Sequence, residues 1–130
     1  MSTENAKLVT EFCMSLEKGD MTKLVSYLSE DVVYHNIPWD PVTGHAGVRK
    51  VLGPFLEGPG SATVKMNIKN TTVAGNTIMN ERLEEWTKGS TKLDLPVIGV
   101  FEIKNGKITH WRDYFDAKTT APLMEAIQKG

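Results

Sequence analysis

The sequence lacks several features on which whole classes of function depend. It has one cysteine, Cys13, so an internal disulfide is excluded, and no Cys/His group stands at metal-binding spacing. Neither sign of charge dominates, since 15 basic and 16 acidic residues leave a net charge of −1. Neither nucleic acid nor an anionic membrane surface is therefore expected as a partner. The longest stretch without Asp, Glu, Lys or Arg, residues 70–80, is polar, so no membrane span is expected.

The chain start also lacks the basic and apolar regions of a signal peptide, and we therefore expect a cytoplasmic protein. What remains is ordinary globular composition, with 40% apolar and 24% charged residues, which excludes disorder and fibrous repeats. A chain of 130 residues is one domain, residues 1–130, and it is large enough to fold without a metal or a disulfide.

Apolar residues at helical spacing predict three helices in the first half of the chain. The first covers residues 8–16 and ends at Gly19, which suits the position after a helix C-terminus. Asp20 is expected to cap a second, shorter helix over residues 21–28. A third apolar stripe at residues 48–55 is broken by the following Gly-Pro-Gly.

Strands are predicted before and after this third helix. Residues 31–37 form the first strand, which Pro38 stops, and a loop continues to Gly44. From residue 64 onward the apolar residues recur with period two, and turn residues divide the rest into four strands. The Asn-Gly pair at residues 105–106 predicts a hairpin with a type I′ turn.

The tail is expected to form a short closing helix, with Thr119 or Thr120 ahead of Pro122. The order is then two helices, a strand, a helix and a meander of four strands, which predicts an α+β fold. One strongly bent sheet around the helices would create a pocket, and this is where function is expected.

Asp113 is the most informative polar residue of the last strand. By alternation it shares one face with Thr109, Trp111 and Phe115. If this face is concave, the carboxylate is desolvated and needs a partner or a shifted pKa. The alternative is an Asp near a strand end that faces solvent.

Arg82 and Glu84 form a second candidate pair, two residues apart on one strand. They share a face with Asn80 and Trp86, and the opposite face is no more apolar. The alternative is an ordinary ion pair on the protein surface.

Tyr34 and Asn36 share a face of the first strand and supply both donors and acceptors. The alternative is a strand end that satisfies its own turn. His35 and His110 point to the other faces of their strands, so neither is expected to be catalytic. Cys13 lies on an apolar helix stripe and is expected to be buried rather than nucleophilic.

Three segments together resemble one known family. They are Tyr34-His-Asn36-Ile-Pro38, Glu81-Arg82-Leu-Glu84, and the run from Gly99 to Asp116 that contains Trp111-Arg-Asp113-Tyr-Phe-Asp. They resemble the limonene-1,2-epoxide hydrolase family, from the first helix to about Asp116. That family belongs to the cone-shaped superfamily of ketosteroid isomerase and nuclear transport factor 2. The resemblance implies a curved, mixed or antiparallel sheet wrapped around N-terminal helices.

The resemblance also implies a reaction, the one-step hydration of an epoxide to a diol without metal, cofactor or covalent intermediate. Asp113 would be the general base on a water that Tyr34 and Asn36 hold, and Arg82 would link it to Glu84. Glu84, where the family usually has Asp, would protonate the epoxide oxygen. The expected partners are a small hydrophobic epoxide, water and a second copy of the chain. The side chains expected to contact the substrate are Trp86, Leu95, Val97, Trp111 and Phe115.

Two other classes of function stay open. An isomerase or a polyketide cyclase-like enzyme of the same superfamily would use one carboxylate to move a proton beside a carbonyl, with neutral donors at the oxyanion. A protein that only binds small lipophilic ligands would have the same fold, because a fold does not determine function.

Overall fold

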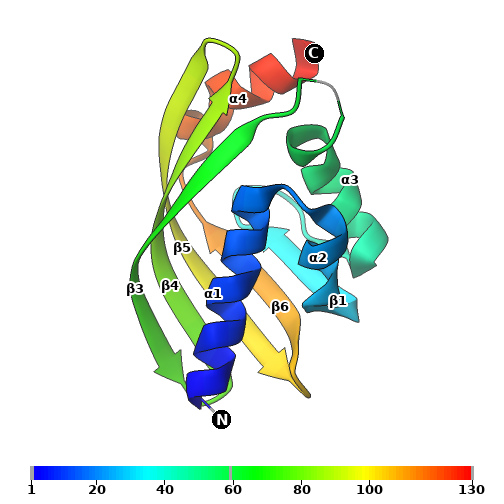
Figure 1. The fold of residues 1–130 in the computed structure, drawn as a ribbon, viewed down its shortest axis with the longest axis vertical. Helices are drawn as coiled ribbons and strands as arrows, with labels where there is room; N and C mark the ends of the chain where they lie inside the picture. The colour runs from blue at the N-terminus through cyan, green and yellow to red at the C-terminus, as the bar shows by residue number, and fades with distance from the viewer. Residues whose placement is uncertain (1, 59, 130) are drawn as a thin grey trace.

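The computed structural model describes residues 2–58 and 60–129, which form four helices and one curved sheet of six strands (Figure 1). Helices α1, α2 and α3 lie on one side of the curved sheet, and α4 contacts strands β4 and β5 near one end of it (Figure 1). This arrangement confirms the predicted α+β class. The elements are α1 (Ser2–Lys18), α2 (Met21–Ser26), β1 (Leu28–Asn36), β2 (Val42–Thr43), α3 (Gly44–Leu56), β3 (Thr63–Ala74), β4 (Thr77–Lys88), β5 (Thr91–Lys104), β6 (Lys107–Tyr114) and α4 (Ala117–Lys129).

The strands are ordered β2-β1-β6-β5-β4-β3 across the sheet. Strands β3 to β6 form the predicted antiparallel meander, and β1 then pairs in parallel with β6, so the sheet is mixed. The β5–β6 hairpin turns at Asn105 (φ +52°) and Gly106 (φ +75°). Two positive φ angles are what a type I′ turn requires, so this prediction is confirmed.

The predicted boundary between the first two helices is confirmed, but α1 starts at Ser2, ahead of the predicted residue 8, and α2 ends at Ser26 rather than at residue 28. Gly19 follows α1 with φ +69°, and the Asp20 side chain accepts the Lys23 backbone N–H at 3.0 Å at the start of α2. The predicted bounds of the first strand, residues 31–37, were wrong, since β1 covers Leu28–Asn36. The loop after it contains the short strand β2, which pairs with β1.

The predicted start of the closing helix was wrong. Helix α4 begins at Ala117, because Asp116 Oδ1 accepts the Lys118 backbone N–H at 2.9 Å and supplies the N-terminal cap. Pro122 therefore lies inside the helix instead of in its first turn. None of the helices in the described ranges is long and apolar enough to cross a membrane.

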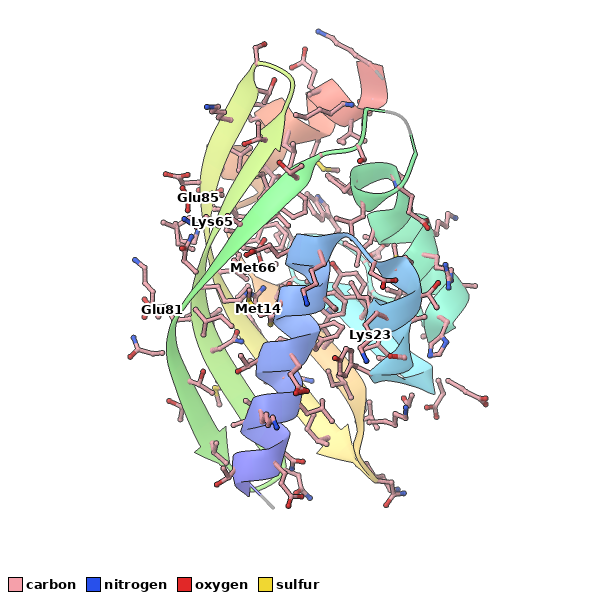
Figure 2. The ribbon with its side chains drawn as sticks, in the orientation of Figure 1. Met14, Lys23, Lys65, Met66, Glu81 and Glu85 are labelled. Carbon is pink, nitrogen blue, oxygen red and sulfur yellow. The ribbon has the colours of Figure 1, made fainter. Side chains whose placement is uncertain are left out.

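The two faces of the sheet differ in what covers them. Met66 lies between the sheet and α1, whereas Lys65 and Glu85 point to the outer side (Figure 2). The outer face also exposes apolar side chains, among them the register partners Ile98 and Tyr114. The inner, concave face is therefore the one that packs against the helices and encloses the core.

Candidate active site

A cavity of about 540 Å³ lies between the concave face of the sheet and helices α1, α3 and α4. Its wall is mostly apolar, which suits a small lipophilic molecule. The side chains predicted to contact a substrate all line it, namely Trp86, Leu95, Val97, Trp111 and Phe115. Four of the five predicted catalytic residues also line it: Tyr34, Asn36, Glu84 and Asp113.

Helix α4 closes one side of this cavity, a role not predicted from the sequence. The helix contributes Thr120, Leu123, Met124, Ile127 and Gln128 to the wall. The spacing of these residues is itself a signal, since positions three and four apart share one helix face. This face was not recognised because the helix was predicted to begin at Thr119 or Thr120 rather than at Ala117.

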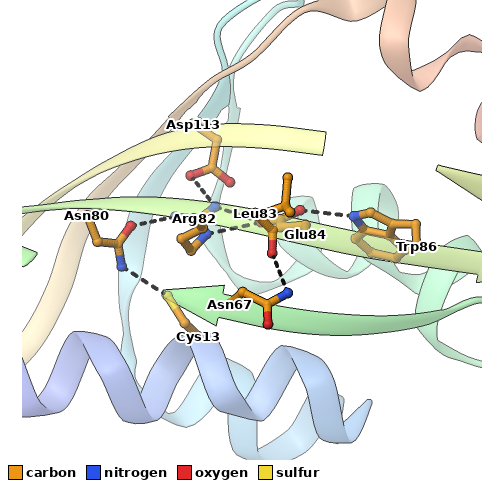
Figure 3. Close-up of polar contacts among 8 residues, drawn as sticks. All are labelled: Cys13, Asn67, Asn80, Arg82, Leu83, Glu84, Trp86 and Asp113. Atoms are coloured by element: carbon orange, nitrogen blue, oxygen red, sulfur yellow. Dashed lines mark hydrogen bonds and ion pairs between the residues drawn. The ribbon is translucent and has the colours of Figure 1, made fainter. Parts of the chain in front are cut away.

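Arg82 joins the two carboxyl groups of the cavity (Figure 3). Its Nη2 lies 2.8 Å from Glu84 Oε2 and 3.0 Å from Asp113 Oδ1. Its Nε donates to the same Glu84 oxygen at 3.1 Å. Arg82 is 1% exposed, Glu84 5% and Asp113 6%. The two alternatives, an ion pair of Arg82 and Glu84 on the protein surface and a solvent-facing Asp113, are therefore wrong.

Strand alternation and one glycine explain how the arginine reaches both carboxyl groups. Arg82 and Glu84 share the concave face of β4, but Asp113 lies on β6, with β5 in between. At this level β5 carries Gly99, which is the register partner of both Asn80 and Asp113. A Cβ on Gly99 would lie 2.3 Å from Arg82 Nη1, so a side chain here would block the guanidinium. The glycine leaves the space that the arginine needs to cross β5.

Glu84 receives hydrogen bonds on both of its oxygens. Oε2 accepts from Arg82 Nε and Nη2, and Oε1 accepts from Trp86 Nε1 at 2.9 Å (Figure 3). Donors of this kind stabilise the ionised form of a carboxyl group. The arrangement therefore fits a group that ends a reaction step as a carboxylate.

Asp113 lies next to the polar residues of β1. Asn36 is its register partner across the parallel β1–β6 pair, and Tyr34 is the partner of Trp111. The Tyr34 and Trp111 rings are stacked, with centroids 3.8 Å apart and planes 15° apart. Strand β4, which carries Glu84, is two strands farther along the sheet. The amide and phenol of β1 are thus placed on the Asp113 side of the cavity.

Burial and charge set the protonation of these groups. Burial raises the pKa of Asp113, the Arg82 guanidinium opposes this rise, and the charge of Glu84 adds to it. Burial alone would lower the pKa of Arg82, but Asp113 and Glu84 hold it well above its usual value, so the guanidinium stays charged. Burial, followed by the charge of Asp113, raises the pKa of Tyr34 well above its usual value. The phenol is therefore a neutral hydrogen-bond donor.

The other titratable candidates lie outside this group. His35 Nε2 bonds the carbonyl of Trp39 at 2.7 Å, and His110 lies on the outer side near Glu102. Cys13 is buried as predicted, and burial raises its pKa to about 11, which keeps the thiol protonated. Among residues 2–58 and 60–129, no cluster of three or more His, Cys, Asp or Glu side chains could hold a metal ion.

Two residues of this site were missed as functional candidates. Asn80 was placed on the correct face but given no role, and its Oδ1 accepts from Arg82 Nη1 at 2.7 Å. Gly99 was noted only as part of the family-like segment. A glycine inside an apolar strand, here residues 95–101, is a known signal of close approach by another group.

Comparison with known proteins decides the family. Residues 3–126 match the family described as limonene-1,2-epoxide hydrolase catalytic domain. The chain belongs to the limonene-1,2-epoxide hydrolase family. The resemblance inferred from the sequence segments is therefore confirmed, and it extends past Asp116 into α4.

An epoxide hydrolase and a solved structure described as LEH-like (limonene-1,2-epoxide hydrolase-like), both from Mycobacterium tuberculosis, are similar to this chain. The chain is 29% identical over 108 residues to epoxide hydrolase EphG of strain ATCC 25618 / H37Rv, which covers 83% of this chain and 70% of EphG. It is 26% identical to the solved structure of an M. tuberculosis LEH-like epoxide hydrolase, with a TM-score of 0.80 and coverage of 99% of this chain and 92% of that chain. The epoxide hydrolase/cyclase-like enzyme SalBIII has a TM-score of 0.77 at 17% identity, over 90% of this chain and 94% of its own, and shows the shared fold alone.

Glu84 has one methylene more than the Asp that the resemblance implied at this position. The longer side chain is held at both ends of its carboxyl group, by Arg82 on one side and by Trp86 on the other. The indole N–H therefore restrains the extra rotational freedom that the additional methylene brings.

Proposed function

We propose that this protein adds one water molecule to a small hydrophobic epoxide and releases a vicinal diol. The observation that carries the proposal is the buried bridge of Glu84, Arg82 and Asp113 at the wall of an apolar cavity. Neutral water opens an epoxide slowly unless a base takes a proton from the attacking water and an acid protonates the leaving oxygen. Two carboxyl groups around one guanidinium supply both roles, and membership of the limonene-1,2-epoxide hydrolase family supports the reaction.

Asp113 is the proposed general base. Within the described part of the chain, its buried Oδ1 accepts no well-aligned hydrogen bond, although the ion pair with Arg82 lies at 3.0 Å. A water between Asp113, Tyr34 and Asn36 would donate to this carboxylate and bond the phenol and the amide. The raised pKa makes Asp113 a stronger base than an exposed aspartate.

Glu84 is the proposed general acid. Two ionised carboxyl groups beside a single guanidinium are disfavoured in a dry site, so the proposed reactive form has Glu84 protonated and Asp113 ionised. When Glu84 gives this proton to the epoxide oxygen, the donors from Arg82 and Trp86 stabilise the carboxylate that remains. Each positioned proton transfer of this kind contributes about 10²–10⁴-fold to the rate.

The two other classes of function predict different behaviour. An isomerase or cyclase-like enzyme needs one carboxylate and neutral donors, so the charged group of Arg82, Glu84 and Asp113 is more than enolisation requires. A protein that only binds lipophiles would bind apolar ligands without turnover, and Asp113→Asn would change affinity alone.

The deciding experiment is incubation of the purified protein with a panel of small cyclic and terminal epoxides, followed by detection of diols. We expect diol from at least one epoxide, and none with Asp113→Asn or Glu84→Gln. Glu85→Gln is the matched control, because Glu85 is the next residue of the same strand and points to the outer face. The proposal fails if no epoxide gives a diol, or if Asp113→Asn forms diol as fast as the unmodified protein.

We further propose that two copies pair through the outer face of the sheet. This face exposes Ile98 (43%), Tyr114 (44%) and Met79 (40%), although each is a large apolar side chain. Burying such a face against itself by two-fold symmetry is the commonest route to a homodimer.

A further inference from the structure

A second layer of polar contacts lies behind the Arg82 bridge. Asn80 is 2% exposed and sits two residues before Arg82 on the same face of β4. Its Oδ1 accepts from Arg82 Nη1 at 2.7 Å, and its Nδ2 lies 3.5 Å from Cys13 Sγ on α1 (Figure 3). Because a guanidinium can only donate, the amide oxygen must face Arg82, and the amide nitrogen then faces the thiol.

Asn80 binds the guanidinium at Nη1, on the side opposite to the two carboxyl groups. Glu84 binds Nε and Nη2, Asp113 approaches Nη2, and Asn80 takes Nη1. Without an acceptor at Nη1, the arginine could turn and pair with one carboxyl group at the expense of the other. Reactions that need exact placement are sensitive to such shifts, and about 1 Å can cost on the order of 10²-fold in rate.

The neutrality of Asn80 matters as much as its oxygen. An aspartate at position 80 would satisfy Nη1 equally well, but it would place a third carboxylate beside one buried arginine. Like charges nearby disfavour ionisation, so a third carboxylate would raise the pKa of Asp113 further. An amide anchors the arginine and leaves one guanidinium to balance two carboxyl groups.

We propose that Asn80 is a positioning residue that anchors Arg82 Nη1 without adding charge, so that Nη2 stays shared between Glu84 and Asp113. The inference rests on the proposed epoxide hydrolysis and deepens it. Asn80 touches neither the cavity nor the reacting atoms, and its effect passes through Arg82.

The first test compares Asn80→Leu and Asn80→Asp on an epoxide that the unmodified protein hydrolyses. Asn80→Leu should lower kcat by about 10²-fold with little change in KM, because Arg82 loses its anchor. Asn80→Asp keeps an acceptor of the same shape. It should move the acid limb of the pH profile of kcat/KM to a pH about one unit higher. The matched control is Asn67→Leu, which removes a hydrogen-bonded amide from the outer face of β3 and should move neither quantity. An unchanged kcat in Asn80→Leu, or an unchanged pH profile in Asn80→Asp, would overturn the proposal.

The second test depends neither on turnover nor on the folding of an Asn80 variant. The chain has three arginines, so ¹⁵N-labelled guanidinium groups give a readable NMR spectrum, and Arg112→Lys separates the Arg82 signals from those of the ion-paired Arg112. We expect distinct, slowly exchanging Nη1 and Nη2 signals from Arg82. Averaged Nη signals would reject the anchor even if diol forms. Distinct signals in a protein that makes no diol would reject the hydrolysis and keep the anchor.

Discussion

Replacing Gly99 by alanine should separate Arg82 from its two carboxyl partners. The new Cβ would lie 2.3 Å from Arg82 Nη1, 2.8 Å from Phe101 Cε1 and 2.9 Å from Asn80 Oδ1. All three neighbouring side chains are buried, so none can turn out to solvent. The strand itself cannot withdraw, because β5 is paired on both sides at this residue.

The size of the effect follows from these distances. Arg82 Nη1 would have to retreat by about 1 Å to change 2.3 Å into an ordinary contact of at least 3.4 Å. This retreat is too large for the 2.7 Å bond to Asn80 and the 3.0 Å ion pair to Asp113. Breaking a buried ion pair costs about 3–5 kcal/mol. The lower chain entropy of unfolded alanine returns at most about 1 kcal/mol.

Thermal unfolding and turnover both measure this change. A net loss of about 3 kcal/mol should lower the melting temperature by roughly 10 °C, and epoxide turnover should fall with it. Gly53→Ala is the control, since the same substitution in α3 meets only Glu57 Oε1 at 3.4 Å; no gain in helix propensity is expected there, because Pro54 follows. If Gly99→Ala melts and turns over like the unmodified protein, Arg82 has space that the structure does not show, and the reasoning is refuted.

Four further predictions concern the reaction and the assembly. Glu84→Gln should abolish turnover on a confirmed substrate while apolar ligands still bind, and a near-normal kcat would show that another group is the acid. Glu84→Asp should stay active with a changed substrate preference. Because the pKa of Asp113 is raised, kcat/KM should fall on the acid side well above the usual aspartate pKa of about 4; a rate that is flat down to that pH would exclude Asp113 as the base. A single turnover with excess enzyme in ¹⁸O-water should label the diol, whereas an unlabelled diol would indicate an ester on a carboxylate. Light scattering should give about twice the chain mass of 14.4 kDa, and the mass of a single chain would reject the dimer.

Much of this architecture was predictable because the information is local. Helix stripes, the capping residue Asp20 and the Asn105-Gly106 turn depend on neighbours within a few positions, and the structure confirms each of them. The period of two also predicted that Arg82 and Glu84 share a face, because side-chain direction in a strand alternates from residue to residue. The start of α4 was missed because Asp116 competes as a cap with two later threonines.

Apart from the short strand β2 and the start of α4, the sequence by itself therefore determined the elements, their order and which side chains share a face. It left open which face of β4 is buried, because Glu81 and Glu85 on one side are as polar as Arg82 and Glu84 on the other. Only the curvature of the sheet against the helices decided this, since burial depends on what packs opposite a strand. The parallel pairing of β1 with β6 likewise brought Asn36 beside Asp113. Contacts between residues so far apart in the chain produce no periodic pattern in the sequence. The space over Gly99 that Arg82 fills forms only when β4, β5 and β6 pair.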